Sequence, residues 1–306
     1  MPIVVTGAAG FIGAHLVEAL CAEGEDVVAI DRLRGSSADG CSWVTADLLG
    51  GDDAVQDALD GADIVYHLAG RPGVRCTDVD IARQRHRDNT LATQFLAEHT
   101  PLATPVVVSS SSSVYGGTSG APCREDGPVA PRGGYARGKL AAERACAARA
   151  ARGGRVSVLR LFTVAGERQR PDMALSIWIS SLLAGRPVYV HGGVERSRDV
   201  TDVRDVVAVL QRVGQLSPPG VLNVGTGRAH TIGQMISAVE RATGVTAVVR
   251  VIEADPQDPA ATLADTTRLR QIVGVVPHTD LDRLVRRQVA AFVATPVKPT
   301  AVKEPV

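Results

Sequence analysis

The chain has few cysteines, few lysines and no excess of charge of either sign. Its 306 residues include five cysteines, and no two of them form a Cys-x-x-Cys pair. An odd, scattered set predicts reduced thiols and argues against a disulfide framework or a cysteine-held metal. The seven histidines also lack the spacing of metal ligands, so we expect no bound metal. Because 33 basic residues balance 33 acidic ones, no overall field favours a nucleic-acid or membrane partner.

Long apolar runs are missing too. No run reaches the ~18 residues that a membrane span needs. No basic segment with a cleavage site stands before the first apolar run, Ile3-Val4-Val5. We therefore expect a cytoplasmic protein that neither spans nor binds a membrane. With 45% hydrophobic and 22% charged residues, the chain can bury a large core and is predicted to be globular.

Short β-branched runs alternate with segments of helical period through the first half of the chain. The runs lie at 3–5, 27–30, 62–66, 105–108 and 155–159, and the helical segments at 11–23, 52–60, 77–99 and 135–152. This alternation predicts βαβ units, and hence an α/β fold with a doubly wound parallel sheet covered by helices on both faces.

The alternation is looser in the second half of the chain. We expect a first domain over residues 1–165 and a smaller, mixed α/β substrate lobe over 166–295. Parts near 200–225 are expected to return to the first domain. Three prolines in the last dozen residues predict a flexible tail over 296–306.

A glycine-rich turn links the first predicted strand to the first predicted helix. Gly7, Gly10 and Gly13 would permit the tight turn, while the helix N-terminus offers free N–H groups to a pyrophosphate. Asp31 ends the next strand, 24 residues after Gly7, where its carboxylate can accept hydrogen bonds from both ribose hydroxyls. An acid there repels a 2′-phosphate. The first domain is therefore predicted to be of the Rossmann type and to bind NAD rather than NADP, although the neighbouring Arg32 weakens that preference.

Residues beside this turn and after the third strand extend the predicted cofactor site. Phe11 and Ile12 open the helix whose N-terminus would face the pyrophosphate. Asp47 and Leu48 end the third strand and could meet the adenine. Asp47 could equally cap the segment that follows it.

Tyr135 and Lys139 stand four residues apart on a predicted helix, which places both side chains on one face. A nearby ammonium and the nicotinamide cation could lower the pKa of the phenol from about 10 towards 7, which requires about 4 kcal/mol. The alternative is an exposed helix pair without function. Against it, the chain has 30 arginines but only three lysines, and the other two, Lys298 and Lys303, lie in the predicted tail. We therefore expect Tyr135 to be the acid–base residue and Lys139 its electrostatic partner.

These motifs, with three further segments, resemble the extended short-chain dehydrogenase/reductase family, whose best-populated branch is the nucleotide-sugar epimerases and dehydratases. The further segments are Leu68-Ala69-Gly70, Asn89 and the serine run before Val114-Tyr115-Gly116. The resemblance extends over nearly the whole chain. It implies a Rossmann-like sheet with a smaller substrate lobe, and further cofactor contacts from Leu68, Ala69, Gly70, Asn89, Ser109 and Phe162.

The serine run carries the third catalytic residue that the resemblance implies. In the family, a serine or threonine three residues before the valine of Val-Tyr-Gly hydrogen-bonds the reacting hydroxyl, and this position is Ser111. The run could instead be a flexible linker, but the predicted strand directly before it argues against that.

Finer marks resemble the UDP-glucuronate 4-epimerases within that branch. They are Arg160-Leu161-Phe162-Thr163-Val164, Arg170-Pro171-Asp172-Met173-Ala174 and Gly73-Val74-Arg75. Two more segments, 185–188 and 198–203, resemble those that hold uridine and diphosphate throughout the branch. Arg198 in the second could instead be a surface charge beside Glu195 and Asp199. The implied substrate contacts are Arg75, Ser111, Ser112, Tyr135, Thr163, Arg170, Met173, Val188, Tyr189 and Arg198.

Some positions depart from the patterns of related enzymes. The 4,6-dehydratases have an Asp-Glu pair after the hydroxyl-binding residue, and the glucuronate decarboxylases have a Glu directly before the valine. This chain has Ser112 and Ser113 there, which disfavours both chemistries. Related galactose epimerases place a phosphate-binding arginine where this chain has Asp255, so the second diphosphate contact is left unassigned.

Taken with the resemblance, the sequence predicts NAD-dependent epimerisation at C4 of a UDP-sugar. UDP-glucuronate would be converted to UDP-galacturonate through a 4-keto sugar. Other UDP-sugar epimerases, a decarboxylase, a dehydrogenase that releases NADH in each cycle, and a non-catalytic NAD sensor stay open as alternatives. By resemblance we also expect a homodimer formed through the helices at 77–99 and 135–152.

Overall fold

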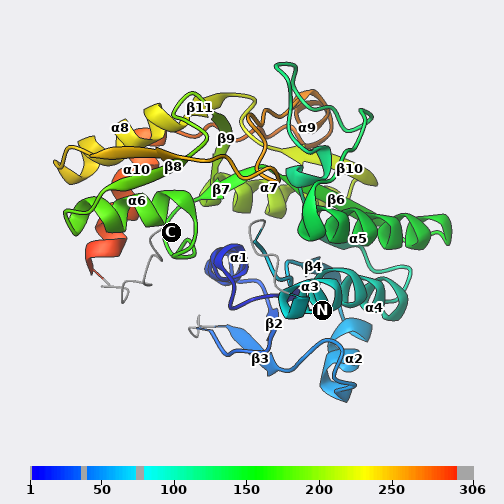
Figure 1. The fold of residues 1–306 in the computed structure, drawn as a ribbon. Helices are drawn as coiled ribbons and strands as arrows, with labels where there is room; N and C mark the ends of the chain where they lie inside the picture. Colours follow the sequence, from blue (N-terminus) through cyan, green and yellow to red (C-terminus); the bar gives the residue numbers. More distant parts are fainter. Residues whose placement is uncertain (1, 36–39, 74–78, 295–306) are drawn as a thin grey trace.

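The computed structural model describes residues 2–35, 40–73 and 79–294 of the chain. Its centre is a seven-stranded sheet in which neighbouring strands run parallel (Figure 1). The strands are β1 (Ile3–Thr6), β2 (Val27–Asp31), β3 (Cys41–Thr45), β4 (Ile64–His67), β5 (Val106–Ser111), β6 (Val156–Leu161) and β10 (Gly220–Val224). The order β10-β6-β5-β4-β1-β2-β3 reverses between β1 and β4, which opens a crevice outside their carboxyl ends. The predicted Rossmann-like fold class is confirmed.

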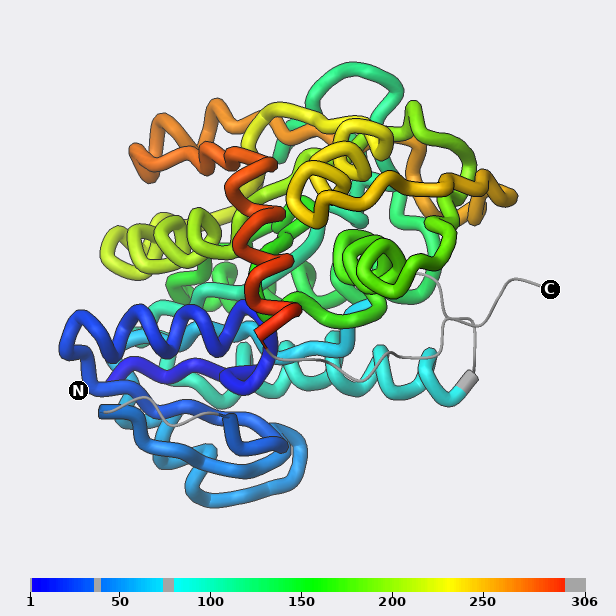
Figure 2. Tube along the Cα trace, turned by 90° about the vertical axis from the view of Figure 1, so that its left-hand side faces the viewer, coloured from blue at the N-terminus to red at the C-terminus, as the bar shows by residue number. Residues whose placement is uncertain are grey.

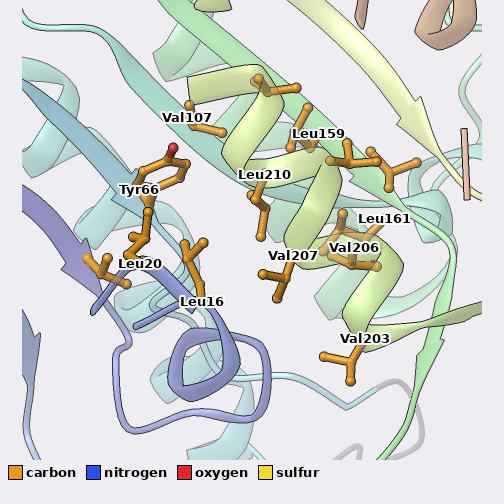
Figure 3. Close-up of a cluster of buried hydrophobic side chains, with 14 of the residues drawn as sticks. Leu16, Leu20, Tyr66, Val107, Leu159, Leu161, Val203, Val206, Val207 and Leu210 are labelled. Carbon is orange, nitrogen blue, oxygen red and sulfur yellow. The ribbon is translucent and has the colours of Figure 1, made fainter. Parts of the chain in front are cut away.

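Helices cover both faces of this sheet, so its central strands are buried on both sides. All residues of β4 and β6 are buried. On one face, α1 (Phe11–Ala22) packs against α7 (Val203–Leu216). Figure 3 shows the apolar side chains of these two helices gathered against Val107, Leu159 and Leu161 of the sheet.

The opposite face carries helices from three parts of the chain. They are α2 (Asp53–Asp60), the continuous run of α3 (Val79–Arg85), η1 (His86–Leu91) and α4 (Ala92–His99), and α5 (Gly133–Ala151). The sequence predicted one regular helix over 77–99, but η1 in its middle is a π-helical segment, and residues 77–78 lie outside the described part. None of the described helices combines the length and the apolar composition that a membrane-spanning helix requires.

The second lobe combines small sheets with helices. Its strands are β7 (Thr163–Ala165), β9 (Ser197–Asp202) and β11 (Ala229–Thr231) in one sheet, and β8 (Val188–His191) and β12 (Val249–Ile252) in another. Its helices are α6 (Ala174–Leu183), α8 (Ile232–Thr243) and α10 (Leu281–Ala294), which enclose a separate apolar core around Trp178 and Leu284. Figures 1 and 2 show α8 at the opposite end of the molecule from β3 and α2.

Two shorter elements and one return of the chain complete the fold. A 3₁₀ turn, η2 (Ser112–Tyr115), follows β5, and α9 (Thr267–Val273) packs beside β10. After the second lobe has begun, the chain returns through α7 to β10 at the edge of the large sheet. The domain limits at 165 and 295 stay predictions, and the predicted tail at 296–306 lies outside the described residues.

A buried arginine fastens α5 to the segment that follows α4. Arg149 is 1% exposed, and its guanidinium donates to the carbonyl oxygens of Ala97 (3.2 Å), Thr100 (2.6 Å), Pro101 (2.5 Å) and Thr104 (2.9 Å). These carbonyls stand at the end of a helix and in the turn after it, where backbone acceptors lack partners. Arg149 therefore supplies donors to the buried acceptors at the end of the helix and on either side of the exposed tip of this turn.

We expect Arg149→Met to lower the free energy of unfolding by about 3 kcal/mol, because several buried carbonyls would lose their donors. Urea unfolding followed by circular dichroism measures the loss. Arg144→Met, at an exposed position of the same helix, is the matched control and should change stability by less than about 0.5 kcal/mol. Equal effects of the two substitutions would show that Arg149 does not fasten the turn.

Candidate active site

The glycine-rich turn after β1 leaves room for backbone alone. Gly7 has a φ of 72°, and a Cβ built on it would lie 2.5 Å from the backbone nitrogen of Ala69. A Cβ on Gly13 would lie 2.1 Å from the carbonyl oxygen of Gly7. Gly10 is the N-cap of α1 and offers no side-chain acceptor to the first-turn amides. These amides and the positive end of the helix dipole therefore suit a pyrophosphate, as the sequence predicted.

A pocket lies between this turn and the carboxyl ends of β2, β3 and β4. Asp31 in its wall accepts hydrogen bonds from the amides of Ala9 (3.0 Å) and Leu33 (3.1 Å), so the carboxylate also fastens the turn to β2. Carboxylate oxygens have about four acceptor sites, which leaves capacity for ribose hydroxyls. The described lining thus fits a dinucleotide. It consists of Gly7, Gly10, Ile30, Asp31, Arg32, Ala46, Asp47, Leu48, Leu68, Ala69, Gly70, Arg87, Asp88 and Ala92.

Two charged residues of this lining were not predicted. Arg87 pairs with Asp47 (2.7 Å), and the Arg32 guanidinium makes two hydrogen bonds to Asp88 (3.3 and 3.2 Å). Asp47 also accepts from the amide of Leu49 (3.0 Å), so its lining position and the alternative turn role coexist. Burial raises the pKa of Asp47, but the Leu49 amide and the Arg87 guanidinium together bring it below its usual value. No sequence motif marks Arg87 or Asp88, because their role depends on segments distant in the chain.

Asn89 holds the loop after β4 through a reciprocal pair of hydrogen bonds. Its Oδ1 accepts from the amide of Arg71 (2.9 Å), and its Nδ2 donates to the carbonyl of the same residue (3.0 Å). A Cβ on Gly70 would lie 2.6 Å from this Oδ1, so only glycine fits there without a shift. The geometry makes Asn89 a positioning residue for the predicted cofactor loop. A direct bond from Asn89 to the cofactor stays a prediction.

Lys139 ties α5 to the end of β5. Its side chain is 7% exposed, and Nζ donates to the carbonyl oxygen of Ser109 at 2.8 Å. The hydroxyl of Ser109 in turn donates to the carbonyl of His67 at 3.2 Å. Burial lowers the pKa of Lys139 to about 8, although Cys146 and Glu143 act in the opposite direction. This ammonium is therefore poised to lose its proton within two units of neutral pH.

Tyr135 and Ser111 meet at the end of β5. The Ser111 hydroxyl accepts from the amide of Ser113 (3.1 Å) and lies close enough to the Tyr135 phenol to lower its pKa. Burial raises the pKa of Tyr135, and the Ser111 hydroxyl with the charges of Arg170 and Arg85 offsets part of this rise. The phenol is therefore protonated at neutral pH in this geometry.

More than one element supplies positive charge near the phenol. The sequence assigned that charge to Lys139, whose ammonium is bonded to the Ser109 carbonyl, and this role stays a prediction. Arg170 and Arg85 also lower the pKa of Tyr135. Arg85 was not predicted, since no motif marks it. A buried ammonium needs a close acceptor, and the backbone oxygen of the neighbouring strand supplies it.

A chain of buried hydrogen bonds links α5 to strands β5, β6 and β10 next to these residues. Glu143 accepts from Ser110 (2.5 Å) and from both ends of the Arg160 guanidinium (3.0 and 2.8 Å). Arg160 also donates to the Tyr115 hydroxyl (2.8 Å), which donates to Asn223 (2.7 Å). Arg160, which the sequence marked as a sign of the subfamily, and Tyr115, a sign of the family, therefore brace the strand ends and are absent from the described lining of the pocket.

Two arginines meet at the loop after β4. A Cβ on Gly73 would lie 3.0 Å from Nη2 of Arg85 and 3.9 Å from Nη2 of Arg170, so the two guanidinium groups share this corner. Arg85 is 6% exposed, and Arg170 also pairs with Asp172 (2.9 Å). Thr163 begins β7 and is half-buried. Ser112, Met173 and Tyr189 are half-buried as well.

Two further predicted contacts have buried side chains. Val188 is fully buried in the core of the second lobe, and Phe162 is packed among Val114, Tyr115 and Ala264. Their contacts with substrate and cofactor stay predictions.

The predicted diphosphate contacts are also changed. Arg198 pairs with Asp258 at 2.7 Å and is mostly buried, so it is no isolated surface charge. Asp255 accepts from the amide of Gln257 (2.8 Å), which gives it a turn role. Arg75 lies outside the described residues.

We expect Asp31→Ala to weaken NAD binding by about 1.5–3 kcal/mol, because hydrogen bonds from ribose hydroxyls to a charged acceptor would be lost. Titration calorimetry with NAD measures the change. Asp57→Ala, at an exposed position of α2, is the control and should leave the affinity unchanged. An unaltered affinity in the Asp31 variant would restrict Asp31 to its bonds with Ala9 and Leu33.

Comparison with known proteins agrees with this geometry. Residues 3–225 match the model of the NAD-dependent epimerase/dehydratase family. The UDP-glucose 4-epimerase of Mycolicibacterium smegmatis is 32% identical over 95% of this chain and 98% of its own.

Solved structures are similar over almost the whole chain. MoeE5 in complex with UDP-glucuronic acid and NAD shares 38% identity at a TM-score of 0.89, covering 96% of this chain and 99% of its own. The UDP-glucuronic acid 4-epimerase from Bacillus cereus, in complex with UDP-glucuronic acid and NAD, shares 29% identity at a TM-score of 0.88, with the same coverage. The predicted resemblance is confirmed, and the chain belongs to the NAD-dependent epimerase/dehydratase family, with NAD as its cofactor.

Proposed function

We propose that this protein epimerises UDP-glucuronate at C4 to UDP-galacturonate. The observation that carries this substrate is the positive charge at the reacting end, where Arg85 and Arg170 both lie close enough to Tyr135 to lower its pKa. A hexuronate has a carboxylate that this positive region attracts, through charge-assisted hydrogen bonds. A neutral hexose has no group of opposite charge to place there.

The hydroxyl groups around Tyr135 support the same substrate. Ser111 and Ser112 follow one another at the end of β5, and Thr163 begins β7. Short hydroxyls can donate to a carboxylate without adding a charge that must be desolvated. The Oγ of Ser113 is buried with no hydrogen-bond partner among the described residues, and we add it to the predicted donors.

The relatives support a UDP-sugar but do not separate the sugars. MoeE5 has been solved with UDP-glucose as well as with UDP-glucuronic acid. The curated relatives include UDP-glucose 4-epimerases and UDP-glucuronic acid decarboxylases. Serines at 112 and 113, where the sequence patterns of dehydratases and decarboxylases have acids, favour epimerisation over those two reactions.

The reaction follows from the residues at the strand ends. Bound NAD supplies the acceptor for the C4 hydride and returns that hydride later. Once the positive charge of the bound nicotinamide has favoured its phenolate form, Tyr135 would remove the proton of the C4 hydroxyl, while Ser111 holds the oxygen, and C4 becomes a ketone. Lys139, held at the Ser109 carbonyl, supplies a buried cation that can take up or release a proton near neutral pH.

Inversion requires the 4-keto sugar to present its other face. The diphosphate stays anchored in the second lobe while the sugar ring turns, and Tyr135 then returns the proton to the C4 oxygen. For a hexuronate the intermediate is a β-keto acid, which loses CO₂ if the carbon–carbon bond aligns with the ketone. Donors that hold the carboxylate near the ring plane would prevent this loss.

Product analysis tests the proposed substrate. The purified protein is incubated in turn with UDP-glucuronate, UDP-glucose and UDP-N-acetylglucosamine, and the products are resolved by chromatography. We expect UDP-galacturonate from the first and much slower conversion of the other two, without accumulation of reduced nicotinamide absorbance. Faster turnover of UDP-glucose would show that UDP-glucose, and not UDP-glucuronate, is the preferred substrate. Steady release of NADH would indicate a dehydrogenase.

Tyr135→Phe removes only the phenolic oxygen. We expect NAD still to co-purify, while turnover falls by at least ~10²-fold, the scale of a lost acid–base group. Turnover is measured from the UDP-galacturonate formed, and bound NAD from the nucleotide released on denaturation. Near-normal turnover would contradict the assigned role, whereas loss of NAD would point to misfolding.

Thr163→Val is nearly isosteric but removes the donor. If Thr163 holds the carboxylate of the 4-keto acid, the variant should epimerise UDP-glucuronate more slowly and release a decarboxylated UDP-pentose or its 4-keto form, detectable by mass spectrometry. Thr163→Ser keeps the hydroxyl and should suppress this release. Equal slowing on UDP-glucose, with no decarboxylated product, would assign Thr163 to the fold or the diphosphate.

A further inference from the structure

Asp88 gathers three arginines beside the cofactor pocket. Its Oδ1 accepts from Arg32 (3.3 Å) and Arg87 (3.0 Å), and its Oδ2 accepts from Arg32 (3.2 Å) and Arg71 (3.1 Å). The carboxylate is 7% exposed, whereas the three arginine side chains are 39–48% exposed. The buried member of the cluster is therefore the acid, and the exposed members are the cations around it.

Two of the arginines bonded to Asp88 also lie beside the other two acids of the cofactor pocket, Asp31 and Asp47. Arg32 follows Asp31 directly, and Arg87 is also bonded to Asp47. Arg32 lies 3.9 Å from Asp47 as well. Arg32, Asp31, Asp47, Arg87 and Asp88 all line the pocket. With Arg71, these make three cations against three anions, so the rim carries no net positive charge to attract an additional phosphate.

The hydrogen bonds between Arg32 and Asp88 affect whether the pocket binds NAD or NADP. An arginine next to the ribose-binding acid is the group that would pair with the 2′-phosphate of NADP. Here both terminal nitrogens of that guanidinium are bonded to the two oxygens of Asp88. To reach a 2′-phosphate, Arg32 would have to leave a buried carboxylate, which is costly because a buried charge needs its partners.

We propose that Asp88 determines cofactor specificity: it withholds Arg32 from the ribose 2′ position, so that Asp31 alone selects NAD. The inference rests on NAD as the cofactor and is independent of which sugar is the substrate. It assigns to η1 a role in reading the dinucleotide, in addition to the support that Asn89 gives to the loop after β4.

A competition experiment tests this role without using turnover. Holoenzyme is equilibrated with equal, saturating NAD and NADP, washed and denatured, and the released nucleotides are quantified by chromatography. In Asp88→Asn, which keeps the shape and removes one charge, we expect the NADP:NAD ratio to rise about tenfold or more, the scale of one charge-assisted hydrogen bond. Asp57→Asn, on exposed α2, is the charge-matched control and should leave the ratio unchanged.

The double variant identifies the residue that Asp88 restrains. Adding Arg32→Ala to Asp88→Asn should return the ratio to the wild-type value, since the released guanidinium would be gone. A ratio that stays high would show that Arg32 is not the restrained group, and no rise in Asp88→Asn would overturn the proposal.

Arg32→Ala alone keeps the proposal testable if Asp88→Asn does not fold, because Arg32 is half-exposed. With Arg32 withheld by Asp88, this single variant should change the NADP:NAD ratio less than about twofold. A tenfold fall in bound NADP would show that Arg32 already serves the phosphate and would contradict the proposal. Circular dichroism and the amount of co-purified NAD establish that each variant is folded.

Discussion

The bond from the Lys139 ammonium to the Ser109 carbonyl sets the geometry on which the reacting residues depend. A buried ammonium must have an acceptor at close range, and here the acceptor is the backbone of the neighbouring strand. Tyr135 lies one helical turn before Lys139, and Ser111 lies two residues after Ser109. Fixing the helix against the strand at one point therefore also fixes the phenol against the hydroxyl.

Neighbouring bonds make that attachment rigid. Ser110 donates to Glu143, one turn beyond Lys139, and Glu143 holds Arg160 from the adjacent strand β6. Three consecutive residues of β5 thus contact α5: the Ser109 carbonyl at Lys139, the Ser110 hydroxyl at Glu143, and Ser111 near Tyr135. Serine suits this contact because a short side chain permits a close helix and still carries a donor and acceptors. The serine run, which could have been a flexible linker, is instead the contact between β5 and α5.

Features that depend on spacing along the chain could be predicted from the sequence. The turn of Gly7 to Gly13 and the Tyr135–Lys139 pair are each contained within one turn or one helix, so local geometry determines them. The βαβ alternation likewise predicts the parallel sheet. These elements needed no knowledge of how distant segments meet.

Features that depend on distant segments could not be predicted. The bond between Arg32 and Asp88 joins residues 56 apart, and Arg85 reaches Tyr135 from a different helix. Val188 occupies a position that the family pattern marks for the substrate. Its side chain is buried in the apolar core of the second lobe, which α8 and α10, much later in the chain, help to form. Packing of that kind leaves no trace in the spacing of residues near position 188.

The geometry of two contacts explains why one holds arginines and the other a lysine. At the cofactor pocket, Asp88 takes hydrogen bonds from three guanidinium groups, a geometry that planar forks with several donors can satisfy. At the Ser109 carbonyl a single acceptor faces the cation, and an arginine there would bury donors without partners. Lysine differs in a second way, since burial lowers the pKa of Lys139 to about 8 whereas arginine stays charged. The site therefore holds one cation that can exchange a proton among others of fixed charge, and it lies one turn from the phenol that must do the same.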